Sequence, residues 1–195
     1  KNTMQITTEQ LFDHARTHNV WLDRPVSEDT LRQLYDMMKF GPTSANCSPL
    51  RIQFVTSAQG KARLVPLMDA GNQAKTAKAP VVAILGMDLA FYEHMGELFP
   101  HNPGARGWFE GQPAKIEATA FRNSSLQGGY FILAARALGL DCGPMSGFDA
   151  AKVDAEFWAG TQVKTNFICN LGHGDASQLF PRSPRLSFEQ ACRVV

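Results

Sequence analysis

Apolar residues recur at helical spacing in several parts of the chain. Between residues 31 and 38 they stand three, four and seven positions apart, which is the period of one buried helix face. Ser27, which precedes two acidic residues, is suited to start this helix, and Gly41-Pro42 is suited to end it. The same reasoning predicts helices from Thr7 to between 16 and 19, at 58–69, at 113–138 and at 149–158, and a short one after Ser187.

Three stretches have the pattern of strands. Residues 51–56 alternate between polar and apolar side chains, as a strand does. Residues 80–87 form a continuous apolar run that suits a strand buried on both faces, and residues 163–171 are a third candidate. Several glycines and prolines in 88–112 predict an irregular excursion or lid, and 140–148 is too rich in them to predict regular structure. Strands interleaved with helices indicate an α+β or α/β protein with few strands and much helix.

The composition indicates one soluble domain over residues 1–195 and excludes several classes of protein. Lys and Arg number 19 and Asp and Glu 18, so a net charge of +1 offers no electrostatic footprint for nucleic acid. No apolar run approaches the roughly 20 residues of a membrane helix. The four cysteines are far apart and form no CxxC pair, so we expect reduced thiols in a cytoplasmic protein.

Two local patterns imitate functional motifs but lack their context. His14 and His18 have a spacing that can bind zinc on a helix, yet the glutamate of HExxH is missing and no third ligand is near, so we expect no metal. Residues 172–177 nearly spell a dinucleotide fingerprint, but no long helix follows and Pro181 and Pro184 break the next segment. We therefore predict no Rossmann-type site.

Four polar segments have short or cationic side chains that suit ligand binding: 16–19, 41–49, 71–75 and 181–185. Arg reads phosphate with two parallel hydrogen bonds, so the first and last of these segments could converge on one phosphate. Each segment taken singly is more typical of a solvated loop or a surface charge. Sequence spacing leaves both interpretations open.

Three motifs allow these segments to be read together as parts of one site: Gly41-Pro-Thr-Ser-Ala-Asn-Cys-Ser-Pro49, Phe121-Arg-Asn-Ser-Ser-Leu-Gln127 and Gly139-Leu-Asp-Cys-Gly-Pro-Met-Ser-Gly-Phe148. In this order they resemble the FMN-dependent nitroreductase family, over nearly the whole chain from Leu11 to Val195. With Pro184-Arg-Leu-Ser-Phe-Glu189 they are most similar to the malonic semialdehyde reductases of bacterial pyrimidine degradation, the Rut type.

The resemblance implies an α+β fold with a central, mostly antiparallel sheet flanked by helices. It also implies an interlocked homodimer with two FMN sites at the interface. FMN phosphate and ring edge would contact Arg16, Thr17 and His18, with Arg182 or Arg185 closing on the phosphate. Pro42, Thr43, Ser44 and Asn46 would come from the partner, Asn72 and Lys75 would meet the ribityl and pyrimidine side, and Pro144, Met145, Ser146 and Gly147 would cover the flavin near N5. Many family members carry Glu where Ser146 stands and some carry Lys where Val20 stands.

The activity implied by the resemblance is ping-pong hydride transfer from NADH or NADPH through flavin N5 to a second substrate. For malonic semialdehyde the product would be 3-hydroxypropionate, and Arg106, His101 and Arg122 are the candidate contacts for its carboxylate. No side-chain acid stands out in the motifs, so we expect solvent or a substrate-bound water to supply the proton for carbonyl reduction. The flavin carries the chemistry at N5, and the backbone of Ser146 and Gly147 would lie near that atom. A broad nitro or quinone reductase and a non-catalytic flavin-binding protein remain as alternatives.

Overall fold

Four strands form one sheet in which all neighbours are antiparallel. The computed structural model describes residues 5–195. Its strands are β1 (Leu50–Val55), β2 (Val81–Asp88), β3 (Asp141–Met145) and β4 (Val163–Gly172), in the spatial order β1-β2-β4-β3. The two long strands β2 and β4 are therefore central, and β3 is an edge strand.

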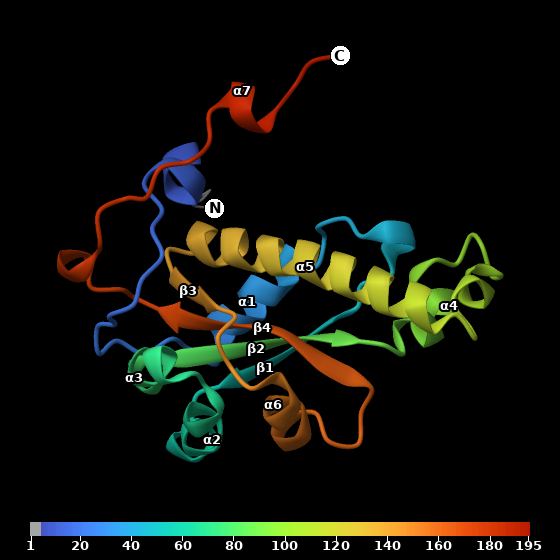
Figure 1. Cartoon of the computed structure of the whole chain (residues 1–195), viewed down its shortest axis with the longest axis horizontal. Helices are drawn as coiled ribbons and strands as arrows, with labels where there is room; N and C mark the ends of the chain where they lie inside the picture. The colour runs from blue at the N-terminus through green and yellow to red at the C-terminus, as the bar shows by residue number, and fades with distance from the viewer. Residues whose placement is uncertain (1–4) are drawn as a thin grey trace.

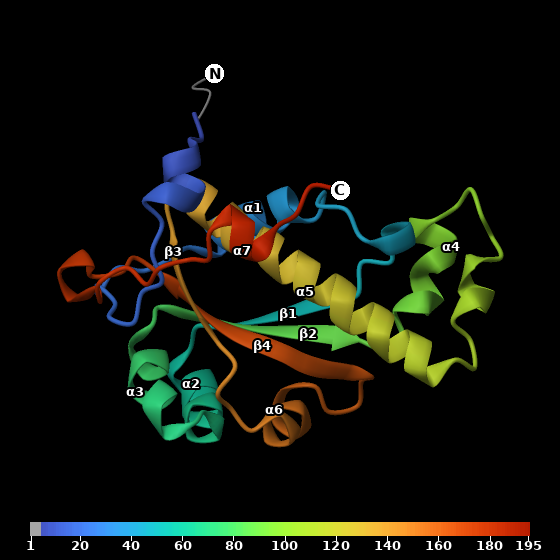
Figure 2. The same ribbon diagram turned by 45° about the horizontal axis from the view of Figure 1, so that its top comes forward.

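Helices cover both faces of this sheet, as the two views show (Figures 1 and 2). On one face lie α1 (Glu28–Met38) and the long α5 (Pro113–Ala137), and on the other α2 (Ala58–Leu64), α3 (Ala70–Lys78) and α6 (Ala150–Phe157). The short α4 (Met95–Leu98) lies at one end and α7 (Phe188–Ala191) on a C-terminal arm. Among residues 5–195, no helix is long and apolar enough to cross a membrane.

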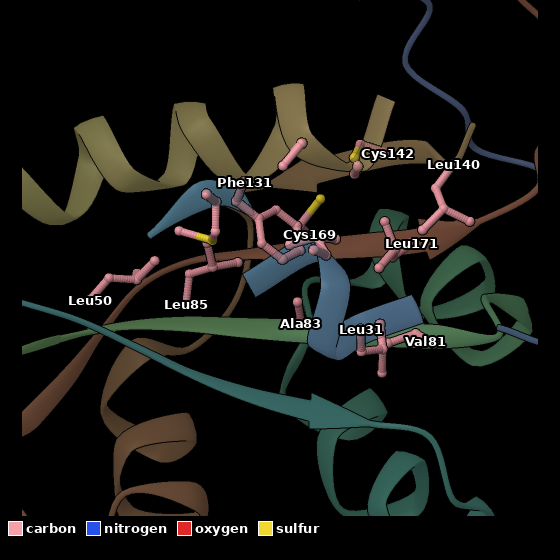
Figure 3. Close-up of a cluster of buried hydrophobic side chains, with 14 residues drawn as sticks. Leu31, Leu50, Val81, Ala83, Leu85, Phe131, Leu140, Cys142, Cys169 and Leu171 are labelled. Atoms are coloured by element: carbon pink, nitrogen blue, oxygen red, sulfur yellow. The ribbon is translucent and has the colours of Figure 1, made fainter. Parts of the chain in front are cut away.

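Strand β2 joins the two halves of the hydrophobic core. Its Val81, Ala83 and Leu85 pack with α1 and α5, for example against Phe131 (Figure 3). The intervening residues, such as Ile84, pack on the opposite face with residues of α2 and α6. The prediction of a strand buried on both faces is confirmed, and each such aliphatic side chain contributes about 1.5–3 kcal/mol by its burial.

The predicted helix ends are confirmed wherever a local capping signal determines them. Ser27 accepts a hydrogen bond from Thr30 N (3.2 Å) at the start of α1, and Ser187 forms a capping box at the start of α7. Asp149 caps α6 by accepting from Lys152 N (3.1 Å). Gly139 follows α5 with a φ of +78°, the left-handed conformation that glycine adopts without strain.

The predicted first helix is much shorter than expected, a correction with a visible cause. Only a single π-turn, Glu9–Asp13, is helical. The side chain of Gln10 donates to the carbonyls of Arg136 (2.7 Å) and Ala137 (3.1 Å) and so attaches this turn to the C-terminal end of α5. The chain then becomes extended and pairs with β3.

Two further elements depart from the sequence prediction. The segment 140–148 contains strand β3, although it was predicted to be irregular, because an edge strand tolerates a residue such as Pro144 that cannot donate to the ladder. Helix α3 was not predicted, because its sequence is polar and only Thr76 is buried. Both elements carry candidate site residues.

The predicted lid at 88–112 is not irregular but folds into short helical turns around its own core. These turns are 91–94, α4 and 105–108. Phe91 and Phe109 meet edge to face, with ring centroids 4.9 Å apart, and pack in one cluster with Met95 and with Cys47 from a distant loop. Burial raises the pKa of the Cys47 thiol to about 11. The excursion and the 41–48 loop thus form one packed unit.

Candidate functional site

The extended segment after the N-terminal turn lies along the edge of the sheet. Thr17 forms a parallel bridge with Cys142 of β3, and His18 N donates to Cys142 O (3.0 Å). Trp21 forms a bridge with Gly174 beyond the end of β4. These pairings place the 16–19 segment next to the N-terminal half of β3.

Gly143 is what permits this close approach. A Cβ atom at this position would lie 2.5 Å from the backbone oxygen of His18 and 3.2 Å from the ring of Trp21. Because a backbone carbonyl in a bridge cannot swing aside as a side chain can, only glycine fits here. The glycine-rich motif therefore has a packing role at the site as well as any role toward a ligand.

The two basic segments from opposite ends of the chain do converge. A cavity of about 230 Å³ is lined by Arg16 from one and by Arg182 and Arg185 from the other, together with Arg136 from the last turn of α5. Its remaining lining residues include no carboxylate. Four guanidinium groups around a space of this size favour a small, multiply charged anion such as a phosphate ester.

The arginines hold the two chain ends across each other by hydrogen bonds to main-chain carbonyls. Arg16 donates to Phe180 O on the C-terminal arm, while Arg182 donates back to Phe12 O (3.1 Å) and Asp13 O on the N-terminal turn. Among the described residues, Arg185 donates only to carbonyls of its own segment, Ser183 O (2.9 Å) and Pro184 O (3.3 Å). None of these bonds neutralises the positive charge.

Helix α3 continues this cationic surface toward β3. Lys75 Nζ donates to Asn19 Oδ1 (3.2 Å), and Asn19 also lines the arginine cavity. Asn72 Nδ2 donates to Gly147 O (2.9 Å), which also accepts from Asp69 N (3.0 Å). Segments 16–19, 69–75 and 143–147, all predicted as site segments in part, therefore lie together.

The end of β3 and the turn that follows it present backbone and two exposed side chains. Pro144 and Ser146 are exposed, whereas the Met145 side chain is buried, with its sulfur 3.5 Å from Thr76 Oγ1 and 3.6 Å from Asn170 Nδ2. Any contact of Met145 with a ligand is therefore through its main chain. A Cβ atom on Gly147 would lie 2.7 Å from Asn72 Nδ2, so this turn rests tightly on α3.

The side chain of His18 does not line the arginine cavity, although it was predicted to contact the FMN phosphate and ring edge. The imidazole is buried against Gly174 and Trp21, and its Nε2 lies 3.6 Å from Asp141 Oδ1. Only its main chain remains available to a ligand. The neighbouring Arg16 and Asn19 side chains line the cavity instead.

The 42–46 loop lies elsewhere in the protomer. Ser44 N donates to Asn123 Oδ1 (2.8 Å), and Pro42 O accepts from Tyr130 (2.7 Å). Asn123 is thirteen residues before Arg136 on α5, which corresponds to about 20 Å along the helix. Thr43 Oγ1 accepts from Ser48 N (3.1 Å), and Asn46 Nδ2 donates to Leu98 O (2.8 Å) of the excursion.

The candidate substrate contacts are not gathered around the arginine cavity. Arg106 is paired with Glu93 and Glu110, each at 2.8 Å, and these carboxylates raise the pKa of its guanidinium while Arg106 lowers that of Glu93. His101 is exposed on the excursion against Phe99. Arg122 is exposed on the outer face of α5. A carboxylate contact with Arg106 would have to displace two acidic partners.

Sequence reasoning missed one of the four arginines that line the cavity, Arg136. A single basic residue in the last turn of a helix is ordinarily explained by the helix dipole, so its sequence context carries no sign of a ligand. Only the packing of the N-terminal turn against the end of α5 reveals its position. No group of three or more His, Cys, Asp or Glu residues suited to a metal is found among residues 5–195.

The fold is thus an antiparallel sheet with helices on both faces and a cationic cavity at its edge. The family model described as the nitroreductase family matches residues 15–173, and the chain belongs to that family. A relative from Leptothrix cholodnii, provisionally named NADH dehydrogenase/NAD(P)H nitroreductase, is 60% identical over 97% of this chain and 96% of its own length. A relative of the same provisional name from Burkholderia lata is 62% identical over 95% of each chain.

The fold is shared with solved structures of much lower identity. A nitroreductase-type protein from Exiguobacterium sibiricum, solved in complex with FMN, superposes with a TM-score of 0.88 at 19% identity. The match covers 99% of this chain and 100% of that one. The predicted α+β nitroreductase-like fold with an antiparallel sheet is thereby confirmed.

Proposed function

We propose that this protein is an FMN-dependent oxidoreductase that takes hydride from NADH or NADPH. The arginine cavity carries the proposal, because it offers a polyanion four cations and no competing carboxylate. The family membership and the names of the relatives support the same reaction class. The FMN in the Exiguobacterium sibiricum structure supports the choice of flavin.

In this proposal the chain binds FMN through segments that already lie together. Arg16, with Arg182 or Arg185, takes the phosphate, and Thr17 contributes beside it. Asn72 and Lys75 face the ribityl and pyrimidine side. The main chain of Pro144, Met145, Ser146 and Gly147 covers the ring, since the turn rests on α3 through Asn72 and Asp69.

Bound FMN would supply the hydride-accepting and hydride-donating chemistry at N5. The protein's part is position and electrostatics. The hydrogen bond of Lys75 to Asn19 (3.2 Å) fixes a positive charge beside the arginine cavity. At this position the charge would stabilise negative charge on a bound ligand. The backbone N–H groups of Ser146 and Gly147 are the donors available at the exposed turn.

For the electron acceptor we propose malonic semialdehyde, whose reduction with NAD(P)H and a proton gives 3-hydroxypropionate. The motif resemblance supports this choice. The ion pairs of Arg106 with Glu93 and Glu110 and the names of the relatives favour a different acceptor, a nitro or quinone compound without a carboxylate.

A direct comparison of acceptors decides between these two. NADPH and NADH oxidation by the FMN-loaded protein is measured with malonic semialdehyde and, separately, with a nitroaromatic and a quinone. A higher kcat/KM for the semialdehyde supports the narrow assignment. A higher value for the nitroaromatic or quinone contradicts it and makes the protein a broad reductase.

We also propose that the site is completed in a homodimer, with Pro42, Thr43, Ser44 and Asn46 of one protomer reaching the FMN of its partner. Within one protomer Ser44 bonds to Asn123, about 20 Å along α5 from Arg136 of the cavity, and Pro42 bonds to Tyr130, about 9 Å along it. The outer face of α5 exposes Phe121 and Leu126, and the C-terminal arm exposes Leu186 and Phe188. Such apolar groups, gathered on an exposed face and arm, are typical of an interface.

A charge on the outer face of α5 tests this arrangement. Leu126→Glu is expected to split the dimer and to release FMN with it, because a charge buried in an interface is strongly unfavourable. Size-exclusion chromatography with light scattering, recorded together with flavin absorbance, measures both. Ala155→Glu places the same charge on exposed α6, across the sheet, and is expected to leave both unchanged. A monomeric Leu126→Glu protein that keeps its FMN would contradict the shared site.

A further inference from the structure

We infer that Arg136 is a fourth phosphate-binding residue, which joins cofactor binding to the docking of the N-terminal turn. The inference rests on the proposed function and extends it to a residue that the motifs did not indicate. Arg136 comes from the last turn of α5, whereas the other three arginines come from the two ends of the chain.

The hydrogen bonding of Arg136 is incomplete. Its Nη1 donates to Leu11 O (2.9 Å), but its Nε is buried and has no partner among residues 5–195. A buried guanidinium N–H without an acceptor is costly, and such donors are nearly always satisfied in native proteins. Arg136 lines the same cavity as Arg16 and Arg182, and its Nη2 makes no hydrogen bond among residues 5–195, so an anion bound there is the acceptor that the geometry provides for this group.

The same residue also anchors the turn that closes the cavity. Gln10 donates to the carbonyls of Arg136 and Ala137, Arg136 donates to Leu11 O, and Arg182 donates to Phe12 O. An anion held by Arg136 and Arg182 would therefore tie the N-terminal turn, the C-terminal arm and the end of α5 together. Phosphate binding and docking of both chain ends should be coupled.

Flavins with and without the phosphate separate this role from a purely structural one. Dissociation constants for FMN and for riboflavin are measured by flavin fluorescence with the wild type and Arg136→Met. The variant is expected to bind FMN roughly 10- to 100-fold more weakly, as for the loss of a hydrogen bond to a charged group, with riboflavin binding unchanged. The FMN dissociation constant of Arg136→Lys, which keeps the charge, is expected to lie between those of the wild type and Arg136→Met.

Two control variants identify the cause. Gln10→Ala loosens the N-terminal turn but leaves the cavity's charges intact, and Arg32→Met removes an exposed arginine of α1 that pairs with Glu28. Because docking and phosphate binding are coupled, Gln10→Ala is expected to weaken FMN binding, but by less than Arg136→Met does. Arg32→Met is expected to keep the wild-type ratio of FMN to riboflavin affinity, and thermal unfolding checks that each variant is folded. The inference is overturned if Gln10→Ala reproduces the loss, or if Arg136→Met weakens both flavins equally or neither. A wild type that binds neither flavin would instead overturn the proposed function.

Discussion

Replacing Lys75 with methionine is expected to lower the midpoint potential of bound FMN by about 30–60 mV. This corresponds to the loss of about 1.5–3 kcal/mol for a hydrogen bond to a charged group in a two-electron couple. Lys75 is held by Asn19 beside the arginine cavity, and a cation near the pyrimidine side favours the reduced, more negative state of a flavin. Methionine retains most of the length of the side chain and removes the charge. A spectroelectrochemical titration measures the shift.

Lys78 supplies the matched control for this prediction. It lies three residues further along α3 and is exposed. Lys78→Met therefore removes the same charge from the same helix and leaves Lys75 and its bond to Asn19 in place. Its potential is expected to equal that of the wild type. Equal shifts in the two variants would mean that only the overall charge of the helix matters, which contradicts the placement of Lys75 at the flavin.

Gly143→Ala is expected to lower the free energy of unfolding by about 1–3 kcal/mol, the usual cost of overpacking. The added Cβ would lie 2.5 Å from His18 O, so β3 and the 16–19 segment must separate. That separation disturbs the hydrogen bond from His18 N to Cys142 O and, with it, the position of Arg16. The FMN affinity is therefore expected to fall together with stability. Chemical denaturation and a flavin titration measure the two effects.

Gly96→Ala controls for the general effect of removing a glycine. Gly96 lies in α4, and among residues 5–195 no atom outside its chain neighbours and the local helix backbone lies within 4 Å of the position its Cβ would take. Alanine is favoured over glycine in a helix by up to about 1 kcal/mol, so this variant is expected to be neutral or more stable. If Gly143→Ala is as stable as the wild type and binds FMN equally well, the close approach of the two segments is not what shapes the site.

The elements with a local signal were predictable from the sequence, and they form the frame of the fold. The apolar period of α1 with its Ser27 cap, the continuous apolar run of β2 and the capping box at Ser187 each determine their own conformation from neighbouring residues. The family resemblance added the antiparallel arrangement of the sheet, which no local pattern in these strands specifies.

The elements that were predicted wrongly or missed depend on contacts between residues far apart in the sequence. The N-terminal helix stops after one turn because Gln10 bonds to the end of α5, more than a hundred residues away. Strand β3 tolerates Pro144 because it happens to be an edge strand, and α3 is held by packing of Thr76 and by Asn72 rather than by an apolar face. Tertiary contacts overrode local propensity in all three cases.

The candidate site was predictable in its parts and not in its assembly. Convergence of Arg16 with Arg182 and Arg185 on a phosphate was one of two open interpretations. The three arginines line one cavity, and their binding of a phosphate stays a prediction. The burial of the His18 side chain against Gly174, the ion pairs of Arg106 and the participation of Arg136 all depend on how distant segments pack. Residue types alone could not distinguish a ligand contact from a structural one at these positions.

The visible absorption spectrum of the purified protein, recorded before and after anaerobic addition of NADPH or NADH, tests the central claim most directly. We expect the spectrum of bound flavin and its bleaching by at least one of the two nicotinamides. A flavin that neither nicotinamide bleaches would indicate a non-catalytic flavin-binding protein. A colourless protein that takes up no added FMN would contradict the cofactor assignment, and with it the roles of Arg16, Lys75 and the turn at Gly147.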